Sequence, residues 1–185
     1  MKLNVKNTKF DNRWYRPGRS LLVILLWYLV NNFIFNSYLF PCNRLKIFLL
    51  RIFGSTIGNG VIIKPKVNIK YPWNLQIGDH VWIGELVWID NLDRIIFGNN
   101  VTISQGALLI SGSHNYKKST FDLLIGKIIL EDGVWIAARS VVASGVTCKS
   151  HSVLTLNSVA TQDLDEYGIY RGNPAVKYRN RIVEM

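Results

Sequence analysis

A repeat of six residues is the feature of this sequence that most restricts how the chain can fold. Between Leu130 and Leu164 the first residue of each hexad is apolar, and the fifth is small or β-branched. The first positions are Leu130, Ile136, Val142, Cys148, Leu154 and Ala160, and the fifth positions are Val134, Ser140, Val146, Ser152 and Ser158. A period of six matches neither the 3.6 residues of a helical turn nor the two of a simple strand. Repeated hexads are instead typical of β-helices.

The same period runs upstream, with two interruptions. The first positions there are Ile57, Ile63, Ile69, Ile77, Ile83, Ile89, Phe97, Ile103 and Leu109, and the fifth positions are Val61, Val67, Val81, Val87, Val101 and Ala107. We predict an all-β solenoid in which each hexad forms a short strand and a turn, and three hexads close a triangular coil. Positions one and five face the axis, and stacked coils bury each other's inner faces. A β-sandwich with accidental spacing is the alternative, which so many hexads in phase disfavour.

The repeat divides the chain into three parts. The 185 residues are enough for one domain with an appendage. We predict a helical N-terminal extension over 1–55, the solenoid over 56–166 and a short C-terminal tail over 167–185. Within the solenoid the repeat stops over 111–129, and a long insertion into a repeat array is usually functional. The two cysteines, Cys42 and Cys148, form neither a disulfide framework nor a metal motif, which favours a reducing, cytoplasmic compartment.

The N-terminal extension combines apolar and basic residues. Residues 21–40 are strongly apolar and follow a helix-breaking Pro17-Gly18 pair, and residues 43–53 read as a second, amphipathic helix. Three interpretations of 21–40 stay open: a helix packed on the solenoid or on a neighbouring subunit, a helix lying in a membrane interface, and a true span. Asn31-Asn32 in mid-run argues against the span, because buried amides need partners.

The charge of the extension points to a partner surface. The net charge is +10, and Asp11 is the only acidic residue before the coils. The basic residues there are Lys2, Lys6, Lys9, Arg13, Arg16, Arg19, Arg44, Lys46 and Arg51. Such a bias is typical of proteins that bind nucleic acid or an anionic membrane. No nucleic-acid-binding motif is present, so we predict peripheral contact of residues 1–51 with the inner face of a membrane.

His114 is the candidate catalytic residue. His80 and His151 both occupy position four of a hexad, a turn position that we read as solvent-facing, whereas His114 lies out of register at the start of the insertion. Imidazole suits a general base, which contributes roughly 10²–10⁴ in rate. A loop histidine without a role is the plain alternative. A catalytic zinc needs three protein ligands, and no second histidine lies near His114, so we predict no metal.

Several motifs resemble those of the hexapeptide-repeat acyltransferases with left-handed parallel β-helices, and more narrowly the colanic acid biosynthesis acetyltransferases of the WcaF type. The shared motifs include Tyr71-Pro72-Trp73-Asn74-Leu75, Ile83-Gly84-Glu85, Ser104-Gln105-Gly106-Ala107, Ser111-Gly112-Ser113-His114, Trp135-Ile136-Ala137-Ala138 and Gly172-Asn173-Pro174-Ala175. The resemblance covers most of residues 50–181. It implies an acetyl-CoA-dependent O-acetyltransferase that works as a homotrimer, with its sites between neighbouring coils.

The resemblance also implies roles for individual residues. His114 would take a proton from an acceptor hydroxyl, and the turn at Trp135–Ala138 would supply an oxyanion donor. The acetyl-CoA site would comprise Trp135, Ala137, Ala143, Ser144, Ser158 and Thr161, with Arg171 and Lys177 near the phosphates. The acceptor side would comprise Glu85, Asp90, Asn91 and Asn115. The chain departs from the family at Asn115, where the family has Asp, and at Gln162, where the family often has Lys.

The expected acceptor is a saccharide or a lipid-linked saccharide in exopolysaccharide or capsule biosynthesis. Two other functions stay open at this stage. One is N-acetyl transfer to an amino sugar, and the other is a non-catalytic β-helix that serves as a scaffold.

Overall fold

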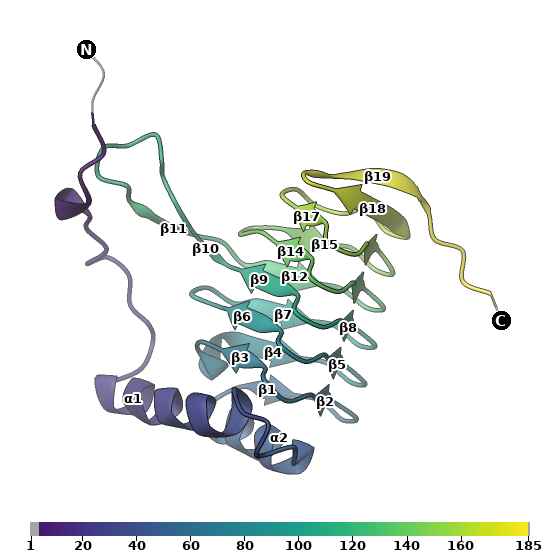
Figure 1. Cartoon of the computed structure of the whole chain (residues 1–185), viewed down its shortest axis with the longest axis horizontal. Helices are drawn as coiled ribbons and strands as arrows, with labels where there is room; N and C mark the ends of the chain where they lie inside the picture. The colour runs from purple at the N-terminus through teal and green to yellow at the C-terminus, as the bar shows by residue number, and fades with distance from the viewer. Residues whose placement is uncertain (1–3, 185) are drawn as a thin grey trace.

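The computed structural model describes residues 4–184 and shows a triangular solenoid (Figure 1). Its three faces are sheets, numbered here one to three, whose strands are parallel except for the last pair of sheet two. Sheet one contains β1 (Thr56–Ile57), β4 (Leu75–Ile77), β7 (Ile95–Phe97), β12 (Ile128–Leu130) and β15 (Thr147–Cys148). Sheet two contains β2 (Ile62–Ile63), β5 (Trp82–Ile83), β8 (Thr102–Ile103), β13 (Trp135–Ile136), β16 (Val153–Leu154), β18 (Gly168–Gly172) and β19 (Ala175–Asn180). Sheet three contains β3 (Asn68–Ile69), β6 (Trp88–Asp90), β9 (Leu108–Ile110), β14 (Val141–Val142) and β17 (Val159–Ala160).

The hexad assignment is confirmed by strand register and burial. Successive position-one residues of sheet two lie directly above one another, from Ile63 through Ile83, Ile103 and Ile136 to Leu154. All five are at most 2% exposed. Inward side chains therefore stack in columns, which is how one coil buries the apolar face of the next. The fold is the left-handed parallel β-helix that the motifs implied.

The turns between strands explain where two of the three histidines lie. His80 and His151 have positive φ angles of 57° and 60°, and each occupies the same turn in its coil. His80 is exposed, as predicted. The prediction for His151 was too simple, because its ring is half-buried and stacks on Tyr167 at a centroid distance of 4.7 Å.

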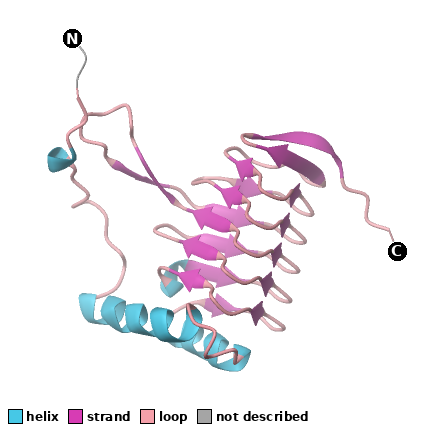
Figure 2. Cartoon of the chain, in the orientation of Figure 1, coloured by secondary structure: helices cyan, strands magenta, loops and turns pink. Residues whose placement is uncertain are grey.

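Two helices close the first coil of the solenoid, seen at the bottom of Figure 2. They are α1 (Leu21–Val30), which continues as a π-helical turn (Asn31–Phe35), and α2 (Asn43–Ile52). Trp27 of α1 is buried and donates from Nε1 to the Ile69 carbonyl at 2.8 Å. The Asn31 amide accepts from the Ile69 N–H and donates to Asn68, so this asparagine has its partners on the solenoid. One face of the apolar stretch thus packs on the protein, the first of the three interpretations.

The other face of α1 and its surroundings stay uncovered in the described chain. No helix within residues 4–184 has both the length and the apolar character needed to cross a bilayer. Lys46 of α2, counted among the basic surface residues, is buried instead, and its Nζ donates to the Lys64 carbonyl at 3.0 Å. Lys2 lies outside the described residues. Short 3₁₀ turns complete the helical inventory at Asn7–Lys9 and Pro72–Asn74.

The insertion and the tail both differ from expectation. The insertion forms an antiparallel hairpin, β10 (Gly112–His114) with β11 (Leu123–Ile125), and the coil resumes at Ile128 in β12. The expected tail over 167–185 also contains structure. Its strand β18 continues sheet two beside β16, and β19 folds back on β18. Sequence periodicity missed both hairpins because neither follows the hexad period.

Candidate active site

The hairpin β10–β11 carries His114 away from the solenoid. It leaves the corner between sheets three and one, after β9 and before β12 (Figure 1). Its base is fixed by Ser111, which is fully buried. The Ser111 carbonyl accepts from the Gly126 N–H at 2.9 Å and from the Ser144 hydroxyl at 2.8 Å. The hairpin is therefore joined to the neighbouring coil at its root.

One hydrogen bond determines which nitrogen of His114 can act as a base. Nδ1 lies 3.1 Å from the carbonyl oxygen of Phe121. A carbonyl oxygen can only accept a hydrogen bond, so Nδ1 must carry the proton. In the neutral ring the lone pair then belongs to Nε2. This arrangement gives the side chain the tautomer that a general base needs.

The ring orientation is held by stacking as well. His114 lies parallel to Phe121, with centroids 4.3 Å apart and an interplanar angle of 6°. Phe121 has a φ angle of 50°, a left-handed conformation that is rare for an aromatic residue. Residues held in such conformations are frequent at functional sites. Here the conformation accompanies a residue that contacts His114 through both its ring and its carbonyl.

Asn115, which stands where the family has Asp, does not contact the imidazole. Its Oδ1 accepts from the backbone N–H of Lys117 at 3.2 Å, and its own backbone N–H donates to the backbone carbonyl of Asp122. The Phe121 carbonyl, and not the residue after the histidine, holds Nδ1. Replacement of the family's Asp by Asn115 therefore leaves the tautomer of His114 unaffected.

A groove runs beside the hairpin over sheet three. Its volume is about 420 Å³, and it is lined by Ile110, Gly112, Ser113, Leu124, Val141, Ala143 and Ser144. Two residues expected to contact acetyl-CoA, Ala143 and Ser144, thus lie in the same hollow as the residue that precedes His114. The lining is mainly apolar with a few polar backbone groups, which is the usual character of a small-molecule site.

The two turns expected to contact acetyl-CoA contain both used and free backbone N–H groups. The N–H groups of Ala137 and Ala143 are used in the ladder, where they donate to Leu154 at 2.9 Å and to Ala160 at 3.0 Å. Within residues 4–184, the N–H groups of Ala138 and Ser144 have no acceptor. A free amide donor therefore exists at each turn, at Ala138 and Ser144, whereas the N–H groups of Ala137 and Ala143 are already used.

The remaining residues expected around acetyl-CoA are spread over different parts of the protomer. Trp135 lies on β13 of sheet two, where its indole donates to Ser104 Oγ at 3.0 Å, and Ala137 follows at the corner between sheets two and three. Ser158 is buried, and its hydroxyl accepts from the Gly172 N–H at 3.0 Å. Its contribution is structural, because it attaches the C-terminal hairpin to the coil.

The expected phosphate-binding residues lie on the C-terminal hairpin. Arg171 of β18 stacks its guanidinium over the ring of Tyr178 at 3.8 Å. Lys177 of β19 pairs with Asp165 at 3.4 Å. Hydrogen bonds from Tyr170 and Lys177 hold the pKa of the Asp165 carboxyl below its usual value. Thr161 is exposed at the end of β17. All three expected residues are accessible, yet the protomer does not bring them to His114.

Four residues were expected on the acceptor side, and the structure separates them. Asp90, one coil below the hairpin, pairs with Lys70 at 2.9 Å. Asn91 is fully buried and exchanges hydrogen bonds with the backbone N–H and carbonyl of Tyr71 at 2.8 and 2.6 Å. Direct contact of Asn91 with an acceptor is therefore corrected to a structural role. Glu85 lies on the corner between β5 and β6, away from the hairpin, and only Asn115 is on the hairpin itself.

Phe10 and Phe121, which contact His114, were missed from the sequence. Phe121 is predictable once the insertion is treated as a hairpin, since His114 pairs with Leu123. Phe10, whose ring centroid is 5.6 Å from that of His114, is 104 positions away in sequence and carries no local signal. No group of three or more potential metal-ligating side chains occurs in the part of the chain that the structure describes.

Comparisons with known proteins agree with this geometry. No protein-family model matches the chain. The chain is 36% identical over 165 residues to the colanic acid biosynthesis acetyltransferase WcaF of Escherichia coli K12, covering 89% of this chain and 91% of that protein. It is 25% identical over 129 residues to the galactoside O-acetyltransferase of the same organism, covering 68% and 64%. Among solved structures it is similar to a hexapeptide-repeat-containing acetyltransferase of Vibrio cholerae O1 biovar eltor complexed with acetyl-CoA. The TM-score is 0.77 with 26% identity, over 86% of this chain and 87% of that one.

Proposed function

The chain belongs to the hexapeptide-repeat acetyltransferases of the WcaF type, and on that premise we propose that it transfers an acetyl group from acetyl-CoA to a saccharide hydroxyl, with His114 as general base. The observation that carries the proposal is the bond between His114 Nδ1 and the Phe121 carbonyl. Because it fixes the proton on Nδ1, it leaves Nε2 as the acceptor for the hydroxyl proton.

The reaction then needs one base and one oxyanion donor. The acceptor hydroxyl gives its proton to Nε2 as its oxygen attacks the thioester carbonyl, and a tetrahedral oxyanion forms. When the carbon–sulfur bond breaks, the proton on Nε2 passes to the departing thiolate, so CoA leaves as the thiol and the base is restored. A backbone N–H stabilises such an oxyanion when it is preorganised. The free N–H groups of Ala138 and Ser144 are the candidates for this contact.

The groove over sheet three supports binding of the donor beside the hairpin. The pantetheine arm of CoA alternates methylene groups with amides, and this groove combines Val141 and Ile110 with the free N–H of Ser144. Arg171 and Lys177 remain the proposed contacts for the phosphates. Ala138 and Ser144 lie on different corners, so one protomer does not bring both N–H groups to the same oxyanion. A site in which both contact the oxyanion would combine two protomers, which agrees with the proposed homotrimer.

Purified protein is expected to release free CoA from acetyl-CoA when an acceptor is present. The acceptor panel is methyl β-galactoside, maltose and glucosamine, and a thiol reagent reports the CoA. Mild alkali removes an O-acetyl ester but leaves an N-acetyl amide, so mass spectrometry before and after alkali separates the two activities. CoA release no faster than in acceptor-free controls, for every sugar, would contradict the proposal. Light scattering on the same sample tests the trimer.

We further propose that the end of the molecule closed by α1 and α2 rests on an anionic membrane. Large apolar side chains there face solvent, and we call this set the basal face. It consists of Leu21, Leu22, Leu25, Leu26, Tyr28, Leu29, Phe33, Tyr38, Leu39, Phe40, Phe48 and Ile52. Apolar side chains scattered singly are normal on a protein surface, whereas this many at one end of a molecule is typical of an interaction site. Exposed Arg16, Arg19, Arg44 and Arg51 belong to the same helices or the segment before them, and this charge complements anionic lipid.

The double variant Leu22→Glu with Leu25→Glu is expected to lose binding to vesicles of phosphatidylglycerol and phosphatidylcholine at least about tenfold. Both side chains are at least 60% exposed, so folding is expected to survive. Each substitution removes roughly 1.5–3 kcal/mol of favourable free energy that the leucine side chain gains when it is buried in the lipid. Cosedimentation measures the binding, and circular dichroism checks the fold. Ile182→Glu is the matched control, because this exposed residue lies on the C-terminal segment. Equal vesicle binding by the double variant and the wild type would refute the basal face, and wild-type binding should weaken with salt.

A further inference from the structure

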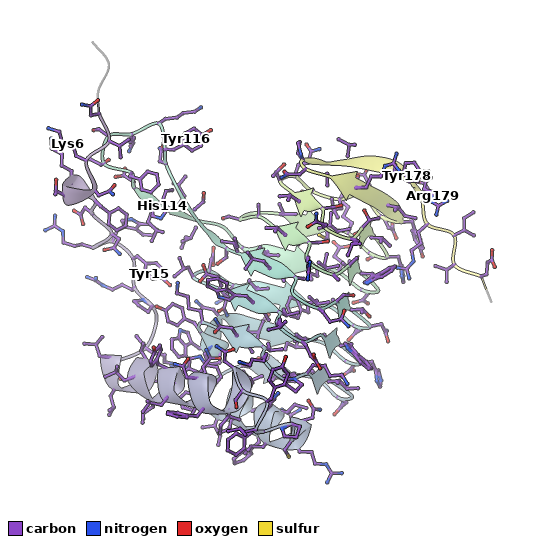
Figure 3. All side chains as sticks on the ribbon, in the orientation of Figure 1. Lys6, Tyr15, His114, Tyr116, Tyr178 and Arg179 are labelled. Carbon is purple, nitrogen blue, oxygen red and sulfur yellow. The ribbon has the colours of Figure 1, made fainter. Side chains whose placement is uncertain are left out.

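The N-terminal segment, residues 4–19, follows the catalytic hairpin instead of extending into solvent. The Lys6 N–H donates to the Ser119 carbonyl in the hairpin loop at 2.9 Å. Further along, the Tyr15 hydroxyl donates to the Leu92 carbonyl at 2.9 Å, and Trp73 Nε1 donates to the Pro17 carbonyl. Figure 3 shows Lys6, Tyr15 and His114 along this side of the molecule. These three attachments give the segment a defined course from α1 to the tip of the hairpin.

Where the segment passes His114, it forms a wall around the imidazole. The Phe10 ring meets the His114 ring at 57° and 5.6 Å, and Phe121 stacks on His114 at 4.3 Å. A hollow of about 230 Å³ remains between Asn7, Phe10, His114 and Phe121. A water molecule occupies about 30 Å³ in the liquid, so the hollow is large enough to admit a group bigger than a single water molecule. An acceptor hydroxyl that approaches His114 through this hollow must contact the segment.

A second, larger hollow lies between the same two elements. It has a volume of about 590 Å³, within the range of about 300–1,000 Å³ that is usual for ligand sites. The segment contributes Asp11, Arg13 and Trp14, and the hairpin contributes Asn115, Lys118, Asp122, Leu123 and Leu124. Asp11, Asn115 and Asp122 directly follow Phe10, His114 and Phe121 in sequence, so both hollows lie between the same stretches of the segment and the hairpin.

The charges of the second hollow are paired. Arg13 binds Asp11 at 2.7 Å, and Lys118 binds Asp122 at 2.9 Å. The hydrogen bonds from Arg13 lower the pKa of the Asp11 carboxyl to about 2, and those from Thr120 and Lys118 lower the pKa of Asp122. Both carboxylates are therefore ionised acceptors near neutral pH. Two cations offset two anions, so the hollow favours a neutral, hydroxyl-rich ligand over a phosphate.

Trp14 adds the apolar surface that such a ligand needs. The side chain is 56% exposed, so one face is free to cover a ring that binds between the segment and the hairpin. A sugar ring combines hydroxyl groups around its edge with C–H groups on its face. Carboxylate and amide groups on one side and an indole on the other match both features.

We infer that residues 4–19 form the acceptor side of the active site, with Trp14 as the platform for a neutral sugar ring and Asn115 and Asp122 as its hydroxyl partners. The inference rests on the proposed function, for which it names the acceptor-binding elements. It also gives the N-terminal segment a role in the reaction that is separate from the basal face.

The Trp14→Ala variant is expected to raise the acceptor KM at least about tenfold and to leave the acetyl-CoA KM within about twofold of wild type. The assay uses whichever of methyl β-galactoside, maltose and glucosamine the wild type acetylates. Trp14→Tyr should recover most of the loss, because a second aromatic ring restores the platform. Trp82→Ala is the matched control, since Trp82 is 43% exposed on sheet two and lies outside both hollows. An unchanged acceptor KM in Trp14→Ala would overturn the inference while the proposed function stands.

Saturation-transfer NMR with the same sugars reads binding without any acetyl transfer. Signals seen with wild type and lost with Trp14→Ala support the inference even where transfer is absent. Sugar signals of equal strength in both proteins, or no signal from any sugar with wild type, would overturn it.

Discussion

Replacing His114 with alanine is expected to lower kcat for acetyl transfer by about 10²- to 10⁴-fold, with small changes in either KM. Removal of a positioned general base has this effect, which corresponds to about 3–5 kcal/mol of transition-state stabilisation. Substrate binding should survive, because the hollow around His114 is also lined by Phe10, Phe121 and Asn7. Steady-state CoA release at saturating donor and acceptor measures the loss.

Two further variants make the assignment specific. His114→Asn can still donate a hydrogen bond to the Phe121 carbonyl but cannot take a proton at neutral pH, so it should be as inactive as the alanine variant. His80→Asn is the matched control, because His80 is an exposed turn residue with a φ of 57°, a conformation that asparagine accepts well. Activity of His114→Ala close to that of His80→Asn would show that another group removes the proton.

The solenoid could be predicted from the sequence because its core is periodic. Position one at Ile63, Ile83 and Ile103 must be apolar in every coil, so the requirement is repeated at a fixed spacing. Such a pattern survives local irregularities, and both interruptions of the repeat fall at the corner from which the hairpin emerges. Burial of Trp27 and Asn31 against the first coil was less predictable, since an apolar stretch is compatible with protein or lipid.

Within the candidate site, the sequence singled out a residue only where that residue broke the period. His114 stood out because it lies off the hexad positions, and the structure places it on a hairpin outside the coils. Phe121 and Phe10 could not be found in the same way, because their contacts to His114 arise from chain reversal and from a segment more than 100 residues away. The buried amide of Asn91 shows the opposite error, in which a polar residue satisfies the backbone of Tyr71 and not a ligand.

Ile103→Ala is expected to lower the free energy of unfolding by about 2–5 kcal/mol, the largest stability effect that we predict. Ile103 is fully buried in the centre of its column, between Ile83 of the coil below and Ile136 of the coil above. Truncation removes apolar burial and leaves a cavity that the rigid ladder on both sides cannot close. In a solenoid it also weakens two coil–coil interfaces at once.

Conservative and neighbouring variants separate packing from other causes of that loss. Ile103→Val should cost about 0.5–1.5 kcal/mol, since one methylene is lost. Thr102→Ala, on the same strand but facing outward, should stay within about 0.5 kcal/mol of wild type. Urea unfolding measures all three at one protein concentration, because association of subunits would shift the midpoint. Ile103→Ala is expected to lose the most stability because the residues of the central column pack on one another from coil to coil. Equal losses in the free energy of unfolding for Ile103→Ala and Thr102→Ala would contradict an inward-facing position one.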